Sequence, residues 1–126
     1  MFPRFSKRRL VSDECDIFFV EKGKGTPVVL LHGFPQTHSM WADVAPLFSD
    51  TYHVICPDLR GYGQSGKPSG YENYTFRNMA KDIIQILKFL NIEKKAHIIG
   101  HDRGARVAYR LAVDHPELVS SVMFMD

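Results

Sequence analysis

Apolar residues in this chain gather in short runs that alternate with longer stretches of mixed polarity. Five runs are rich in β-branched, aromatic or other apolar residues and are bounded by polar or glycine-containing segments, so each predicts a strand. They cover residues 16–20, 27–31, 52–56, 96–100 and 119–125. The run Pro27–Leu31 is apolar at every position, which is typical of a strand in a sheet covered on both faces.

The stretches between these runs predict three helices, over about residues 39–48, 75–91 and 104–114. In the second helix, apolar residues recur at helical spacing and form one stripe, which we expect to pack against a sheet. The stripe consists of Met79, Ala80, Ile83, Ile84, Leu87 and Leu90. Thr75 is of a residue type that caps helix starts. Trp41 lies on the apolar side of the first helix, and we expect it in the core.

Strands joined by helices predict an α/β fold with a mostly parallel, doubly wound sheet. The 126 residues have room for one domain. We expect residues 1–10 to be a basic, solvated lead-in and residues 11–126 to be the domain. The sequence ends one residue after an apolar strand, and intact domains normally cover or pair such an outer edge. We therefore expect residues 11–126 to be the first part of a truncated domain.

Charge and composition exclude several classes of protein. The net charge is +2, and four of the 16 basic residues (Arg4, Lys7, Arg8 and Arg9) precede the first acidic residue. Without them the balance is 12 against 14, or −2, so we expect no nucleic-acid partner. No apolar run approaches the length of a membrane span, and no apolar segment of a secretory signal follows the basic start. Two cysteines and six histidines show no metal-ligand spacing, so we expect no metal, no cofactor and a reducing, cytoplasmic setting.

The most informative motif is Gly100-His101-Asp102-Arg103-Gly104, which follows a predicted strand and opens a predicted helix. This is the context of a nucleophile elbow, in which flanking glycines give clearance to a sharply bent backbone. The alternative is that Asp102 only caps the helix. The complete strand–turn–helix context favours the elbow.

An aspartate at this position indicates a particular chemistry. A carboxylate is ionised at neutral pH and needs no base to attack saturated carbon, where it forms an alkyl ester. Water can then attack the carbonyl of that ester and restore the carboxylate, whereas a serine would leave an uncleavable ether. Asp102 therefore predicts dehalogenation or epoxide opening rather than ester or amide hydrolysis.

Three motifs also carry a resemblance to a known family. They are His32-Gly33-Phe34-Pro35-Gln36-Thr37, Asp58-Leu59-Arg60-Gly61-Tyr62-Gly63 and Gly100-His101-Asp102-Arg103-Gly104-Ala105-Arg106. Together they resemble the haloacetate (fluoroacetate) dehalogenases of the α/β-hydrolase superfamily, from about Val11 onward. The resemblance implies the α/β-hydrolase fold, with residues 11–126 as the N-terminal part of its core domain, lacking the lid and the C-terminal strands.

The resemblance also implies roles for individual residues. Asp102 would be the nucleophile, and the backbone amides of Phe34 and Arg103 would form the oxyanion hole. Arg103 and Arg106 would bind the carboxylate of a small haloacid, for which a pair of guanidinium groups is well suited. Asp126 matches the position of the triad acid that orients a catalytic histidine. We expect Arg110, one turn further along the helix, to be a surface residue.

Two readings remain beside the haloacetate dehalogenase. Epoxide hydrolases and haloalkane dehalogenases belong to the same superfamily, although epoxide hydrolases typically have Trp where this chain has Arg103. A non-catalytic ligand receptor with the same fold is the alternative from another class. None of the six histidines follows the nucleophile and the acid as the triad histidine should, so we expect this chain alone not to turn over. The preferred halogen and the oligomeric state stay open.

Overall fold

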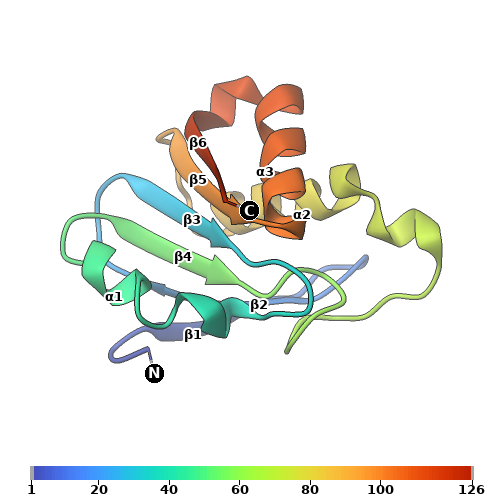
Figure 1. The fold of residues 1–126 in the computed structure, drawn as a ribbon, viewed down its shortest axis with the longest axis horizontal. Helices are drawn as coiled ribbons and strands as arrows, with labels where there is room; N and C mark the ends of the chain where they lie inside the picture. The colour runs from blue at the N-terminus through green and yellow to red at the C-terminus, as the bar shows by residue number, and fades with distance from the viewer. Residues whose placement is uncertain (1, 126) are drawn as a thin grey trace.

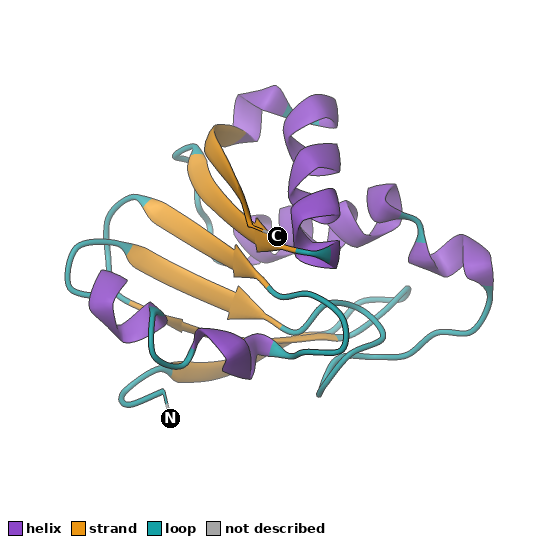
Figure 2. Ribbon diagram, viewed as in Figure 1, coloured by secondary structure: helices purple, strands orange, loops and turns teal. Residues whose placement is uncertain are grey.

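A computed structural model describes residues 2–125 of the chain and contains one six-stranded sheet (Figures 1 and 2). The strands are β1 (Ser6–Leu10), β2 (Ile17–Lys22), β3 (Pro27–Leu31), β4 (His53–Pro57), β5 (Ala96–His101) and β6 (Val119–Met125). The helices are α1 (Ala45–Phe48), α2 (Phe76–Phe89) and α3 (Arg103–Asp114), and three 3-10 helices are η1 (His38–Trp41), η2 (Tyr71–Tyr74) and η3 (Pro116–Leu118).

The sheet has the order β1-β2-β4-β3-β5-β6. Strands β4, β3, β5 and β6 run parallel, while β1 and β2 are antiparallel at one edge. Helix α1 lies on one face, and α2 and α3 lie on the other (Figure 2). The predicted α/β architecture with a mostly parallel, doubly wound sheet is confirmed.

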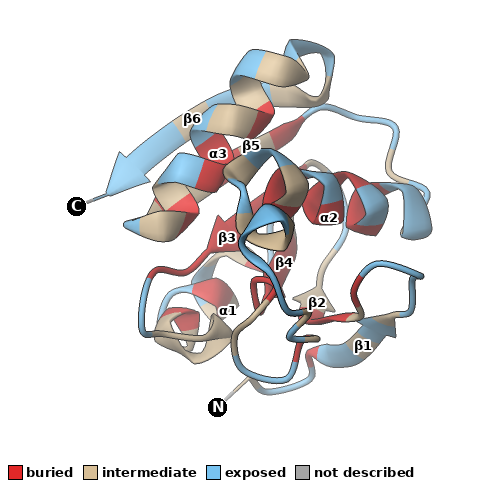
Figure 3. Cartoon of the chain, turned by 90° about the vertical axis from the view of Figure 1, so that its right-hand side faces the viewer, coloured by how far each residue is buried: buried red, intermediate tan, exposed pale blue. Residues whose placement is uncertain are grey.

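The position of β3 in the middle of the sheet explains why all of its residues are apolar. Successive side chains of a strand point to opposite faces. Val29 and Leu31 join the core beneath α2 and α3, whereas Val28 and Leu30 join the core beneath η1 and α1. All five residues of β3 are buried (Figure 3), so both faces of the strand exclude water.

Helix α2 follows the predicted pattern closely. The hydroxyl of Thr75 accepts a hydrogen bond from the backbone N–H of Asn78 and caps the helix start, as expected. Most of the predicted stripe, from Met79 to Leu87, is buried against the sheet, and Leu90 is partly buried against the same core. The predicted core position of Trp41 is also confirmed, since its side chain is 3% exposed.

The predicted continuous helix over residues 39–48 is wrong, because two short helices, η1 and α1, take its place. Pro46 lies in the first turn of α1. A proline has no N–H for the hydrogen bond to the preceding turn, and its ring clashes there, so it is tolerated at a helix start and not in a helix interior. The apolar spacing predicted that Trp41 and Ala45 are buried, which is confirmed, but Val44 on the same predicted side is exposed.

The basic segment at residues 1–10 is more than the solvated lead-in that we expected. Its residues Ser6–Leu10 form β1, which pairs antiparallel with β2 in the register Ser6 with Glu21 to Leu10 with Ile17. Charged side chains on an edge strand discourage pairing with other chains, which accounts for a strand with this composition. Arg8 also forms an ion pair with Glu21 at 3.0 Å.

At the opposite edge, β6 pairs with β5 alone among the described strands, and most of β6 is exposed (Figure 3). Its exposed residues include Met123, Phe124 and Met125. Within residues 2–125, every helix is too short or too polar to cross a lipid bilayer.

Candidate active site

The chain turns sharply between β5 and α3, and Asp102 lies at the turn. Its backbone has φ 54° and ψ −114°, a conformation that residues other than glycine seldom adopt. The carbonyl of Asp102 accepts a hydrogen bond from the N–H of Ala105 at 3.0 Å, so the helix begins at once after the turn. The predicted strand–turn–helix arrangement is therefore present.

The two flanking glycines are required by space. A Cβ atom on Gly100 would lie 2.4 Å from the carbonyl oxygen of Gly104. One on Gly104 would lie 2.2 Å from the carbonyl oxygen of Leu31, at the end of β3. Real Cβ atoms do not approach backbone oxygen this closely, so any larger residue would push α3 away from the sheet.

The Asp102 carboxylate does not cap the helix that follows it. It makes no capping hydrogen bond to α3, and instead Oδ2 accepts a hydrogen bond from the backbone N–H of Phe34 at 3.0 Å. The backbone N–H groups of Phe34 and, to a smaller extent, Arg103 hold the pKa of Asp102 below its ordinary value. The exposed carboxylate is thus kept ionised, with one of its oxygens occupied.

Phe34 is held in place by contacts between two loops, the first after β3 (residues 32–37) and the second after β4 (residues 58–70). The buried ring of His32 accepts a hydrogen bond from the N–H of Leu59 through Nε2, at 2.9 Å, and its Nδ1 lies 2.9 Å from the carbonyl oxygen of Gly33. Only the neutral ring with its proton on Nδ1 satisfies both partners. Burial lowers the pKa of His32, which favours this neutral form.

Asp58 makes the reciprocal connection from the second loop to the first. Its carboxylate accepts hydrogen bonds from the backbone N–H groups of His38 at 2.7 Å and Gln64 at 2.9 Å, and it also contacts the His38 ring. Burial alone would raise the pKa of Asp58, but these hydrogen bonds outweigh it and hold the pKa below the ordinary value. The two loops beside Asp102 are therefore one hydrogen-bonded unit.

A buried ion pair fastens the second loop to α2. The guanidinium of Arg60 donates two hydrogen bonds to the carboxylate of Asp82, both at 2.8 Å, and a third to the carbonyl of Asn73 at 2.9 Å. The Arg60 side chain is 1% exposed. A buried arginine bound in this way fixes the loop's position relative to η2 and the middle of α2.

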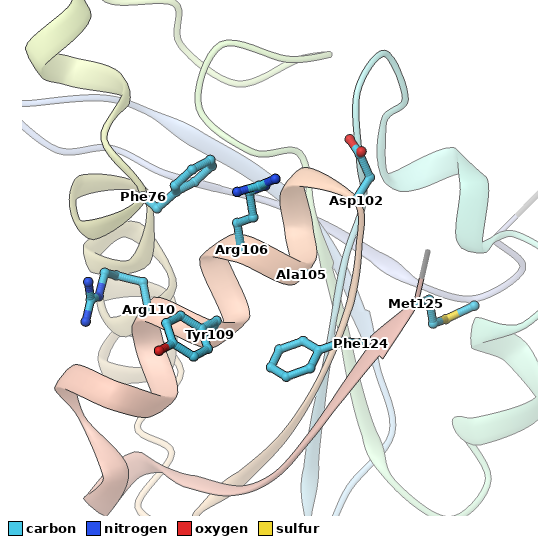
Figure 4. Close-up of a pocket in the computed structure, with 8 residues that line it drawn as sticks. All are labelled: Phe76, Asp102, Ala105, Arg106, Tyr109, Arg110, Phe124 and Met125. Atoms are coloured by element: carbon cyan, nitrogen blue, oxygen red, sulfur yellow. The ribbon is translucent and has the colours of Figure 1, made fainter.

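Five residues line a cleft of about 410 Å³ above the turn: Phe34, Phe76, Asp102, Arg103 and Arg106. A larger groove of about 720 Å³ shares Asp102, Arg106 and Phe76 and continues along α3 past Tyr109 and Arg110 to β6 (Figure 4). The cleft combines one ionised carboxylate with two guanidinium groups. Such a site can bind a small anion beside an ionised carboxylate.

The cleft brings together four of the residues singled out in the sequence: Asp102, Phe34, Arg103 and Arg106. The fifth, Asp126, lies outside the described residues. Arg110, which we expected to be a surface residue, forms an i,i+4 ion pair with Asp114 at 3.1 Å on α3, but its side chain is only partly exposed and lines the larger groove. Sequence reasoning missed Phe76, because the only local sign was an aromatic residue directly after the helix cap.

All six histidines lie in the described part of the chain, and the rings of these six contact groups other than the Asp102 carboxylate. Besides His32 and His38, the partners are Glu21 for His53, Ser121 for His97, Gln36 for His101 and Glu117 for His115. No histidine of residues 2–125 lines the cleft or the larger groove beside Asp102.

This fold and this turn are those of the α/β hydrolases. The sequence profile of the alpha/beta hydrolase fold family matches residues 26–126, and the chain belongs to that family.

Two of the similar curated proteins are named for different activities. The chain is 46% identical to a fluoroacetate dehalogenase of a Burkholderia species over 129 residues, covering 100% of the chain and 42% of that protein. It is 40% identical to a soluble epoxide hydrolase of a Corynebacterium species over 109 residues, covering 86% of the chain and 37% of that protein. The chain thus spans about two fifths of the length of these curated relatives.

A solved structure agrees with the fold. A crystal structure of a Nostoc sp. PCC 7120 protein, described as an α/β hydrolase, superposes with a TM-score of 0.95 at 43% identity. It covers 100% of this chain and 44% of that one. The resemblance found in the three motifs is confirmed by these comparisons.

Proposed function

We propose that this chain carries the nucleophile and the anion-binding arginines of a hydrolase that displaces halide from a small haloacid. One observation carries the proposal: the Asp102 carboxylate, with Oδ2 bound by the Phe34 N–H, shares a small cleft with Arg103 and Arg106. The similarity to a fluoroacetate dehalogenase supports the same choice.

In the first step, Oδ1 of Asp102 attacks the carbon that bears the halogen. A bond from Oδ1 to carbon forms, the carbon–halogen bond breaks with its electron pair, and halide leaves. Asp102 then carries an alkyl ester whose carbonyl oxygen is Oδ2. Because Oδ2 already accepts the Phe34 N–H, the ester carbonyl forms in place, polarised by that amide.

In the second step, water attacks Cγ of the ester. Charge develops on Oδ2, where the amides of Phe34 and Arg103 stabilise it, and collapse of the intermediate releases the hydroxy acid and a proton. The histidine that would accept this proton, and Asp126 as the acid that would orient it, belong to the proposal for the whole protein.

Arg103 and Arg106 offset the repulsion between the substrate's carboxylate and Asp102. Two anions close together repel, and guanidinium groups bind carboxylates through paired hydrogen bonds. Both arginines belong to the first turn of α3, so they move with the nucleophile as one rigid unit.

The test is to incubate the chain with chloroacetate and measure its mass. We expect one stable carboxymethyl adduct on Asp102, located by peptide mapping, and no continued release of chloride, because no histidine of the described residues lines the cleft. Asp102→Asn should abolish the adduct. Catalytic chloride release by the chain, or an adduct elsewhere, would contradict the proposal.

Arg106→Ala tests the anion site, with Arg110→Ala as its matched control on the next turn of the same helix. We expect Arg106→Ala to slow adduct formation by at least about tenfold, since a charge-assisted hydrogen bond is lost. Arg110→Ala should react at nearly the wild-type rate. Equal rates for all three chains would remove Arg106 from the substrate site.

Epoxide opening is the second candidate, because a soluble epoxide hydrolase is among the relatives. It uses the same nucleophile and yields a hydroxyalkyl ester of Asp102, so an uncharged epoxide offered beside chloroacetate separates the two. Faster labelling by the epoxide, with no effect of Arg106→Ala, would favour it. Acid binding without any ester would favour the non-catalytic receptor.

A further inference from the structure

Both arginines of the cleft lie over aromatic rings. The guanidinium carbon of Arg103 is 5.8 Å from the centre of the Phe34 ring, and that of Arg106 is 6.0 Å from the centre of the Phe76 ring. Each distance is within the range of a cation–π contact. The two rings and the two arginines, together with Asp102, make up the whole lining of the smaller cleft.

These aromatic contacts are the principal fixed partners of the two guanidinium groups. Among the described residues, neither group takes part in an ion pair or a side-chain hydrogen bond. Arg60 is the opposite case, since carboxylate and carbonyl oxygens occupy its donors. A guanidinium whose fixed partner is an aromatic ring, and not an oxygen acceptor, keeps its N–H groups available to a ligand.

The rings themselves are held by the fold. Phe76 is the first residue of α2, next to the capping Thr75, and its partly buried side chain packs against the main core. The exposed Phe34 ring makes an edge contact with Tyr62 at 6.3 Å, and Tyr62 in turn contacts buried His32 at 5.2 Å. Each arginine is therefore connected through a ring to a rigid part of the molecule.

We propose that Phe34 and Phe76 are positioning residues that hold Arg103 and Arg106 with their N–H edges free to bind a planar carboxylate beside Asp102. This inference rests on the proposed function for the identity of the ligand and on the ring contacts for the orientation of the arginines. It assigns a role to Phe76 and to the side chain of Phe34, whose backbone alone serves the oxyanion site.

The first experiment needs no ligand. NMR relaxation of the arginine Nε–Hε groups in the free chain should show restricted motion for Arg103 and Arg106, with ring-current shifts. Phe34→Leu should release Arg103 only, Phe76→Leu should release Arg106 only, and Phe76→Tyr should keep Arg106 restricted. Phe89→Leu is the matched control, because it removes a ring that lies 5.2 Å from the guanidinium of Arg8, away from the cleft. Unchanged signals in both cleft variants would overturn the inference.

The second experiment measures labelling of Asp102 by chloroacetate over a range of concentrations. Each leucine variant should raise the half-saturating concentration about two- to fivefold, the factor that corresponds to one exposed cation–π contact. The limiting rate should change less, and Phe76→Tyr should restore the wild-type value.

The two experiments separate the inference from the function. A wild-type chain that is not labelled contradicts the proposed function, while the arginine signals still decide whether the rings hold the guanidinium groups. Labelling that is saturable in the wild type, with the same half-saturating concentration in both leucine variants, overturns the inference alone.

Discussion

A carboxylate between a strand and a helix can either cap the helix or remain available for chemistry, and at Asp102 the contact from Phe34 decides between them. Oδ2 accepts the Phe34 N–H, whereas no capping bond to α3 forms. The two oxygens of one carboxylate thus have different surroundings. In the proposed reaction, Oδ1 attacks and Oδ2 becomes the carbonyl oxygen.

The lowered pKa of Asp102 predicts how labelling depends on pH. A carboxylate with a depressed pKa stays ionised at lower pH than a free aspartate. The proposed nucleophile is therefore fully ionised above the ordinary pKa of aspartate and is lost only as pH falls through the lower, folded-state pKa. We expect the labelling rate by chloroacetate to stay constant from pH 8 down to about pH 4 and to fall below it. The measurement is adduct formation against pH.

A fall in that rate already between pH 7 and pH 5 would contradict the prediction, because it would require a raised pKa or a second titrating group. Chloroacetate itself remains ionised across this range, so its protonation does not produce such a fall. Circular dichroism at each pH should accompany the rates, so that acid unfolding is recognised.

At the scale of elements, the two loops beside the turn and the start of α2 form one supported unit. His32 and Asp58 connect the loops to each other, and Arg60 connects the second loop to Asp82 of α2. This support fixes the Phe34 amide on one side of the cleft and the Phe76 ring on the other. The position of the site therefore depends on polar contacts that lie beneath it.

The Arg60–Asp82 pair gives a test of that support. Asp82→Ala leaves a buried guanidinium without its carboxylate, and breaking a buried pair in this way costs about 3–5 kcal/mol. We expect the free energy of unfolding to fall by that amount in urea denaturation. Arg77→Ala, which removes an exposed ion pair between Arg77 of α2 and Asp114 of α3, should change the unfolding midpoint little.

An Asp82→Ala chain as stable as the wild type would show that the pair is dispensable. Replacing both partners together, Arg60→Met with Asp82→Leu, should recover much of the loss, because no unpaired buried charge then remains. The double variant separates the effect of the unpaired charge from that of the lost packing.

Sequence predicted the elements whose signals are local. The strands β3 and β6 have the predicted bounds, and the cap at Thr75 and the turn at Asp102 were identified because glycines, caps and apolar spacing act within a few residues. The strand β1 and the break before α1 were missed. The first depends on pairing with β2, and the second on a proline whose effect the apolar pattern concealed.

In the candidate site, too, only the residues that belong to local motifs could be predicted from the sequence. Asp102, Arg103 and Arg106 lie in one motif, and Phe34 belongs to a second, so their roles could be suggested from the chain alone. Phe76 and the contact between His38 and Asp58 could not, since they depend on segments far apart in sequence meeting in space. These contacts arise from the packing of α2 and the loops, so no single segment of the sequence indicates them.

At the scale of the whole molecule, the parallel strands place the candidate site at one end of the sheet. Strands β3, β4 and β5 run in the same direction, so the loops that follow them meet at their carboxyl ends (Figure 1). Ligands of open α/β sheets bind at that end.

The chain spans about two fifths of the length of its curated relatives, with 42% of the dehalogenase and 37% of the epoxide hydrolase covered. The part of the fold that it contains is the part that carries the proposed nucleophile.

The unusual backbone of Asp102 has a consequence for the stability of the entire fold. Glycine in place of alanine normally weakens a protein, because glycine loses more freedom on folding. At φ 54° and ψ −114° the order should reverse, since only glycine adopts this conformation without strain. We expect Asp102→Gly to melt at a higher temperature than Asp102→Ala in calorimetry, although both lack the carboxylate. Equal or opposite melting temperatures would mean that the bend is relaxed. The expected order would mean that the backbone at this turn is strained by any side chain, including the one that carries the Asp102 carboxylate.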